Sequence, residues 1–326
     1  MRRPRARWSG PLFGLGVLGV VVWRVGPAPF LDAVHHLDAT ALAIALTITL
    51  ATTLASAYRW TVVARVLGVD LSLASAVRAY YRSQLLNTVL PGGVLGDAER
   101  GLRHGRDVGA RGQALRSVVW ERGAGQAVQL LVTAGVLLFT TSFGGPGLVL
   151  VGAPVVVGLV LAGVTWAVAA TWWQGLTRRL LETMAGDVRL VLLAWRVWPR
   201  VILASLLVVS GHVTVFVVAV RAVGVTASAR TVVPAALVVL AASAVPASFA
   251  GWGPREGAAA AVFAASGLGS GVGVGASAVY GVLVLGSVLP GVVPIVVARV
   301  AAARRSLARP QPAAVTASAQ GVGSGG

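Results

Sequence analysis

Residues 91–100 read PGGVLGDAER, and residues 246–256 read PASFAGWGPRE. Both stretches carry a glycine five positions after a proline and an arginine nine positions after it. The first stretch overlaps the end of an apolar segment, 76–96, and the second overlaps the end of another, 232–253. Each stretch ends in charged residues. Proline lacks the N–H that continues a helix, and glycine permits a tight return of the chain. The two stretches therefore predict interrupted helices that enter and leave a membrane on the same side.

The composition around these stretches favours lipid as the surrounding solvent. Hydrophobic residues make up 56% of the 326 residues and charged residues 11%, with a mean hydropathy of +0.83. Soluble domains carry about 25% charged residues, so this chain has too few polar side chains to cover a water-facing surface. The chain has no cysteine, which excludes disulfides, thiolate metal sites and cysteine nucleophiles.

Six apolar segments predict full crossings, because a helix needs ~20 apolar residues to span a bilayer. The first of them is the shortest and follows a basic N-terminus. The predicted fold class is an all-α polytopic membrane protein with about six transmembrane helices plus two re-entrant helical hairpins in an inverted repeat. The six segments are residues 11–23, 39–57, 118–139, 148–171, 201–220 and 277–300.

Arginine clusters set the predicted orientation. The formal net charge is +17, and the basic residues are all arginines, in short clusters between apolar segments. The positive-inside rule assigns arginine-rich links to the cytoplasm, which places both termini there, in a bacterial-type plasma membrane. This charge pattern also argues against nucleic acid as a partner. With six crossings, the first hairpin enters from the cytoplasm and the second from outside.

The predicted organisation has three parts. A basic cytoplasmic N-terminus (1–10) precedes a transmembrane domain (11–300), and a disordered cytoplasmic tail (301–326) follows it. Within the transmembrane domain, the first half covers about 39–140 and the second about 200–300. In inverted-repeat transporters, interrupted helices at corresponding positions mark the substrate site.

The interrupted segments predict a site for an anionic group at membrane depth. A helix that starts after a break has free N–H groups, and the guanidinium groups of Arg100 and Arg255 suit phosphate. Asp97 and Glu99 can pair with Arg100, and Glu256 can pair with Arg255. The alternative is therefore that these pairs only hold each hairpin shut. The candidate substrate-binding residues are Asp97, Arg100, Glu121, Arg122, Trp252, Arg255 and Glu256.

Glu121 and Arg122 follow Trp120 near the cytoplasmic start of a predicted crossing. They are predicted either as an interfacial pair beside an aromatic anchor or as residues at the mouth of a cavity formed by the first hairpin. Trp252 either lines or plugs that cavity. Flexible joints are expected where proline and glycine interrupt the helices. The candidate joint residues are Pro91, Gly92, Gly93, Gly96, Pro246, Gly251 and Gly253.

No catalytic residue, metal site or cofactor is expected from the sequence. It contains no metal-ligand cluster, no nucleophile elbow and no nucleotide-binding loop. The GxGxxG pattern at residues 14–19 lies in an apolar segment without a βαβ unit, so helix packing explains it better. His212, in the middle of a predicted crossing, is expected to hydrogen-bond a neighbouring helix.

Two motifs resemble the signatures of a known family. Residues 83–100 (SQLLNTVLPGGVLGDAER) followed by 118–122 (VVWER) carry the first, and residues 246–256 carry the second. They resemble the lysylphosphatidylglycerol synthase transmembrane-domain family of flippase-like integral membrane proteins, and the resemblance covers most of residues 39–300. It implies a flippase-like transmembrane domain, with a membrane lipid as substrate and a separate lipid-modifying synthase or glycosyltransferase as partner.

The leading hypothesis is a lipid translocase that moves a phospholipid or lipid-linked head group between leaflets. The head group would enter a polar cavity at Arg100 and Arg255 while its acyl chains stay in lipid. One alternative is a membrane-embedded enzyme that modifies a lipid head group, with Asp97, Glu121 or Glu256 as base. The lack of a catalytic motif counts against an enzyme. The other alternative is a membrane anchor for a separate lipid synthase.

Overall fold

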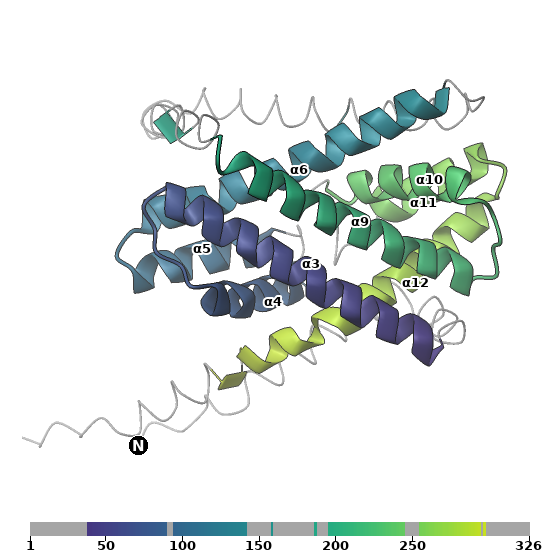
Figure 1. The fold of residues 1–326 in the computed structure, drawn as a ribbon. Helices are drawn as coiled ribbons and strands as arrows, with labels where there is room; N and C mark the ends of the chain where they lie inside the picture. The colour runs from purple at the N-terminus through teal and green to yellow at the C-terminus, as the bar shows by residue number, and fades with distance from the viewer. Residues whose placement is uncertain are drawn as a thin grey trace, which may run out of the picture.

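The described part of the chain is helical. The computed structural model describes residues 38–89, 94–141, 158, 186–187, 195–244, 254–294 and 296–297 (Figure 1). Within these residues the chain forms eight α-helices and one short 3₁₀ helix, and no strand occurs among them. The predicted all-α polytopic fold class is confirmed.

Four long apolar helices form the frame of the molecule. Each has at least 25 residues in its apolar run, and 25 residues at 1.5 Å each span about 37 Å, more than the ~30 Å hydrocarbon core of a bilayer. The predicted crossings at 11–23 and 148–171 lie outside the described residues, so a total of six stays a prediction. The four helices are α3 (Ala39–Val66), α6 (Arg111–Thr141), α9 (Trp198–Ala222) and α12 (Ser270–Val288), the last continued by the 3₁₀ helix η1 (Leu289–Gly291).

Four shorter helices lie between the long ones. They have 12 to 17 residues, or roughly 18–26 Å, which is too short to cross a bilayer. The two members of each pair, α4 with α5 and α10 with α11, pack against each other. The proline-glycine interruptions predicted from the sequence fall between the members of each pair. The four helices are α4 (Leu73–Val89), α5 (Leu95–Asp107), α10 (Ala229–Ala242) and α11 (Pro254–Ala265).

Helix order repeats along the chain. A long helix, two short helices and a second long helix follow one another in α3–α6, and the same order occurs in α9–α12. We call α3–α6 the first half and α9–α12 the second half. The first helices of the two halves, α3 and α9, lie side by side (Figure 1). This order is what an inverted repeat requires. The orientation of the two halves in the membrane, and their status as separate units, stay predictions.

Local signals explain where several helices start and end. The side chain of Asp38 accepts a hydrogen bond from the Ala41 amide and caps the start of α3. Helices α3, α5 and α9 are each followed within two residues by a glycine with positive φ, a conformation that other residues adopt at a cost. These glycines are Gly68 (74°), Gly109 (72°) and Gly224 (82°).

The outside of the helical frame is strongly apolar. Leu131 and Leu138 on α6 are 72% and 71% exposed, and Leu203 on α9 is 69% exposed. Large leucines exposed on long helices match a lipid environment, where no polar cover is needed. Inside, the main apolar core is built largely from the second half around Phe216 and Phe263. The first half instead places polar and charged side chains in its interior.

Candidate substrate-binding site

Five charged side chains meet inside the first half and are called the ionic cluster. They come from three helices: Arg59 from α3, Asp97 and Arg100 from α5, and Glu121 and Arg122 from α6. All but Arg122 are buried. Four of these five residues were predicted from the sequence to lie at the site, and the structure brings those four together.

Glu121 is the acceptor at the centre of the ionic cluster. The Nε of Arg59 donates to its Oε1 at 2.9 Å, and Nη2 of the same guanidinium donates to that oxygen as well. The hydroxyl of Tyr80 donates to Oε1 at 2.7 Å, and Nη2 of Arg100 donates to Oε2 at 2.7 Å. Burial raises the pKa of Tyr80, so its phenol keeps the proton that it donates. Glu121 is 0% exposed, and this set of donors supplies its charge compensation.

Asp97 is the second carboxylate of the ionic cluster. Arg100 Nε donates to its Oδ1 at 2.9 Å, and Arg122 donates to its Oδ2 through Nε at 2.8 Å and through Nη2. Ser83 and Asn87 on α4 add hydrogen bonds of 3.0 and 2.9 Å. Burial alone would raise the pKa of Asp97, but the guanidinium groups of Arg122 and Arg100 outweigh it and lower this pKa to about 2. The carboxylate is therefore ionised at neutral pH.

A close approach of α4 and α5 places Asp97 in this position. A Cβ on Gly96 would lie 2.2 Å from the carbonyl oxygen of Ser83, so only glycine fits there. The Gly96 amide, in the first turn of α5, donates to Asn87 Oδ1 at 2.8 Å. Gly96 thus acts here as a packing contact between two helices. Its predicted role as a flexible joint stays a prediction.

The ionic cluster carries an excess of positive charge. Its three guanidinium groups face two carboxylates, which leaves one positive charge in surplus among these residues. The Arg100 guanidinium also lies over the rings of Trp60 and Tyr80, with its Cζ 4.5 and 4.2 Å from their centroids. These cation–π contacts stabilise the buried guanidinium of Arg100. Because aromatic rings carry no net charge, the cluster as a whole keeps one positive charge that an anion could balance.

A polar cavity of about 240 Å³ opens beside the ionic cluster, between the two halves. Arg59 and Arg122 present their side chains to it, and Arg122 is 45% exposed. No carboxylate lines it in the described part of the chain. The other lining residues are Ser56, Tyr80, Gln84, Gly125, Gln126, Gln129, Ser205, Val208, Val209, His212, Leu240, Ser243, Ala244 and Tyr280.

The second half contributes a smaller charged group. Arg255, at the start of α11, donates to Glu256 Oε1 at 2.9 and 2.7 Å and to Ser277 Oγ at 2.9 Å. Its Cζ lies 5.3 Å from the ring centroid of Tyr280. The hydroxyl of Tyr280 in turn lies 3.0 Å from Nδ1 of His212. The hydrogen bond predicted between His212 and a neighbouring helix is confirmed.

The two arginines predicted at the substrate site do not line the cavity between the halves, whereas Arg59 and Arg122 do. The Arg100 guanidinium lies against the rings of Trp60 and Tyr80, and that of Arg255 lies against the ring of Tyr280, which does line the cavity. Roles of Arg100 and Arg255 in substrate binding stay predictions. The predicted ion pairs of Arg100 with Asp97 and of Arg255 with Glu256 are confirmed.

Other predictions change in detail or fall outside the described residues. Glu99 pairs with Arg82 at 2.6 Å and with Arg103 at 3.9 Å, not with Arg100, so it lies outside the ionic cluster. Glu121 is a fully buried member of the ionic cluster, and its depth relative to the membrane surface stays a prediction. Seven candidate residues lie outside the described part of the chain: Pro91, Gly92, Gly93, Pro246, Gly251, Trp252 and Gly253.

Arg59 is the main residue that sequence analysis missed. It is a single charge well inside the long apolar helix α3, 5% exposed, where a charge is costly unless it is paired or functional. That signal is present in the sequence, but the predicted crossing 39–57 ends two residues before Arg59 and so leaves it outside the membrane. No group of three or more histidine, aspartate or glutamate side chains able to hold a metal occurs among the described residues.

Comparison with known proteins gives one match. Residues 8–291 match a family model described as the lysylphosphatidylglycerol synthase TM region. The match covers the ionic cluster, the cavity and the second charged group. No curated protein and no solved structure matches the chain.

Proposed function

The chain belongs to the lysylphosphatidylglycerol synthase TM-region family, and from that premise we propose that it is a flippase-like lipid translocase. Membership makes it a membrane protein related to lipid metabolism. The proposed activity is movement of a phospholipid or lipid-linked head group between leaflets. A separate lipid-modifying synthase or glycosyltransferase is the proposed source of that lipid.

One observation carries this proposal: the guanidinium of Arg122 stands half exposed in a polar cavity between two helical halves. It belongs to a cluster with one surplus positive charge, so an anionic head group would balance the cluster. Guanidinium groups bind phosphate oxygens through paired N–H donors. The glutamine, serine and tyrosine side chains around Arg122 can bind the remaining polar atoms of a head group.

The position of the cavity favours translocation over simple binding. Helices of both halves line it, so a change in the angle between the halves would change which side it opens to. The apolar outer faces of α6 and α9 leave the acyl chains in lipid. Transport of this kind needs no covalent chemistry in the cavity.

The alternative of a lipid-modifying enzyme is less well supported. A general base needs a free lone pair directed at the substrate. Asp97 and Glu121 each accept several hydrogen bonds from guanidinium groups, and neither lines the cavity. Glu256 accepts from both Arg255 and Ser277. Lipid analysis of a deletion strain separates the two: loss of an enzyme removes a lipid species, and loss of a translocase only misplaces it.

The direct test is leaflet exchange in vesicles that contain the purified chain. Fluorescent phosphatidylglycerol, phosphatidylcholine and a polyprenyl phosphate are followed by quenching of the outer leaflet. Arg122→Gln should slow the anionic lipids by roughly 10-fold or more, because one charge-assisted hydrogen bond is worth about 1.5–3 kcal/mol. Arg230→Gln, an exposed arginine at the start of α10, is the matched control and should leave the rate unchanged. If no head-group class moves faster than in empty vesicles, the proposal fails.

A further inference from the structure

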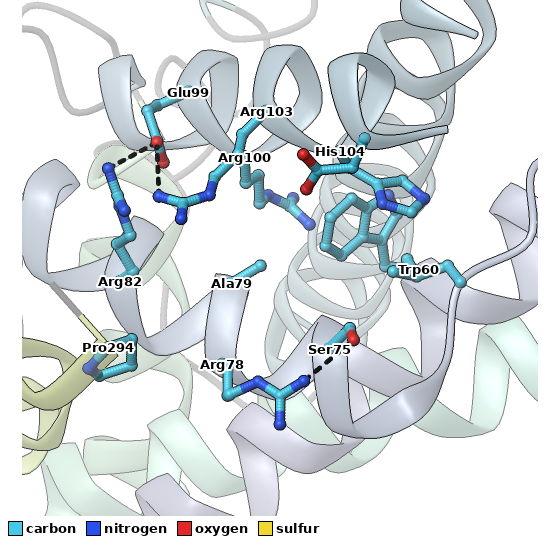
Figure 2. Close-up of a pocket in the computed structure, with 12 residues that line it drawn as sticks. Trp60, Ser75, Arg78, Ala79, Arg82, Glu99, Arg100, Arg103, His104 and Pro294 are labelled. Atoms are coloured by element: carbon cyan, nitrogen blue, oxygen red, sulfur yellow. Dashed lines mark hydrogen bonds and ion pairs between the residues drawn. The ribbon is translucent and has the colours of Figure 1, made fainter. Parts of the chain in front are cut away.

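A second pocket lies between α4 and α5 (Figure 2). It has a volume of about 170 Å³. At ~30 Å³ per water molecule, that leaves room for a phosphate group with water around it. It shares no lining residue with the cavity between the halves. Its lining residues are Trp60, Leu71, Ser75, Arg78, Ala79, Arg82, Glu99, Arg100, Arg103, His104, Asp107 and Pro294.

The lining of this pocket is predominantly cationic. The α4 residues come from one helix face, since Ser75, Arg78, Ala79 and Arg82 follow the spacing of successive turns. The α5 residues facing them add two further arginines and a histidine. Four arginines and two carboxylates therefore line the pocket. Because the charge of Arg100 is already paired with Asp97 and Glu121, the other three arginines leave an excess of one positive charge, with the histidine neutral.

One of the two carboxylates, Glu99, is paired with arginines of the same pocket. Glu99 pairs with Arg82 at 2.6 Å and with Arg103 at 3.9 Å (Figure 2). Arg78 is exposed and donates to Ser75 at 3.1 Å, and Arg103 has 47% of its side chain exposed. These two long cationic side chains can reach an anion at the opening without breaking a buried ion pair.

The floor of the pocket holds buried polar atoms that lack a partner. Arg100 uses its Nε for Asp97 and its Nη2 for Glu121, while its Nη1 is buried and has no hydrogen-bond partner in the described part of the chain. Nε2 of His104, the next pocket residue on the same helix face, is likewise buried without a partner there. Buried polar atoms without hydrogen-bond partners are rare and costly. An anion in the pocket would accept a hydrogen bond from Nη1 of Arg100, and from Nε2 of His104 in the tautomer in which that nitrogen carries the proton.

We propose that this pocket binds the phosphate group of a ligand. Arg78 and Arg103 hold the phosphate oxygens at the opening, and Nη1 of Arg100 with the His104 ring forms the floor. The ligand is a phospholipid head group or soluble phosphate, which present the same group. The proposal does not depend on lipid translocation, because the pocket is separate from the cavity and its occupancy is measured with no leaflet exchange.

Calorimetric titration of the full chain in detergent tests this proposal. The probes are dioctanoyl phosphatidylglycerol and inorganic phosphate, and the parent for all titrations carries Arg122→Gln to weaken binding in the cavity. Adding Arg78→Gln with Arg103→Gln should raise the Kd of the binding probe at least tenfold. The matched control, Arg106→Gln with Arg111→Gln, changes two exposed arginines of the same region that do not line the pocket.

The outcomes are distinct. Binding of the lipid probe that the pocket variant alone weakens supports a head-group site, and the same result with inorganic phosphate supports a site for soluble phosphate. If neither probe binds, or if the control weakens binding as much as the pocket variant, the proposal is overturned. The single changes Arg78→Gln and Arg103→Gln, each at an exposed side chain, give the same test if the double variant does not fold.

Discussion

Glu121→Gln removes the negative charge at the centre of the ionic cluster and keeps the shape of the side chain. Glu121 is 0% exposed and accepts hydrogen bonds from Arg59, Tyr80 and Arg100. Breaking a buried ion pair by removing one partner costs about 3–5 kcal/mol, and here two guanidinium groups lose their counter-charge. Since 1 kcal/mol shifts Tm by about 2–4 °C in a domain of this size class, we expect Tm to fall by on the order of 10 °C.

Intrinsic fluorescence of the protein's ten tryptophans, recorded on heating in detergent, measures this Tm. Glu99→Gln is the matched control, because Glu99 is 30% exposed and its ion pairs lie near the surface. An exposed pair is worth about 0–1 kcal/mol, so its Tm should change little. A Glu121→Gln protein as stable as the parent, or a Glu99→Gln protein destabilised equally, would refute the assignment of the ionic cluster as a mutually dependent unit.

Three further predictions follow from the same geometry. Gly96→Ala should lower stability by about 1–3 kcal/mol, because a Cβ there would lie 2.2 Å from a carbonyl of α4. The control Gly123→Ala on α6 meets no atom within 4 Å and should leave stability unchanged or raise it by up to about 1 kcal/mol in the same melt, because alanine favours a helix over glycine. The pKa of Asp97 is lowered from 3.8 to about 2, so the ionised carboxylate should stabilise the fold above about pH 4, and this contribution should be lost as the pH falls toward 2. Asp97→Asn should remove the part of the pH dependence of Tm that arises between these two values. In this cysteine-free chain, Val108→Cys should react with an impermeant thiol reagent from the cytoplasm and Thr226→Cys from outside; reaction of both from one side would contradict the inverted orientation of the halves.

Much of the helical frame could be predicted from the sequence. Apolar runs of bilayer length fix where a helix can cross, and three predicted segments, 39–57, 118–139 and 201–220, fall inside α3, α6 and α9. The short helices were predicted from the proline and glycine interruptions, since those residues break the backbone hydrogen-bond pattern. Pairings between neighbours, such as Asp97 with Arg100, three residues apart on one helix, could also be predicted.

The position of the cavity could not be predicted, because it depends on helix packing. Arg59 meets Glu121 across 62 residues of sequence and Ser205 across 146, and no periodicity of the chain indicates either contact. Small residues decide how closely these helices approach: a Cβ on Gly125 would lie 2.8 Å from the Arg59 guanidinium. The arginines of the interrupted segments were the more conspicuous ones in the sequence. Of the two arginines facing the cavity, Arg122 was among the predicted site residues, whereas Arg59 follows directly on a long apolar segment and stands between a tyrosine and a tryptophan.

Arg59 and Gln129 also connect the two halves. Arg59 donates to Ser205 on α9 at 2.8 Å, and Gln129 donates to the carbonyl of Leu237 on α10 at 3.4 Å. Within the first half, by contrast, the ionic cluster ties α3, α5 and α6 together with buried ion pairs. Arg59, Gln129 and Ser205 all line the cavity. The two hydrogen bonds that join the halves therefore have their donors at the cavity wall, where any polar group that entered would compete for those donors.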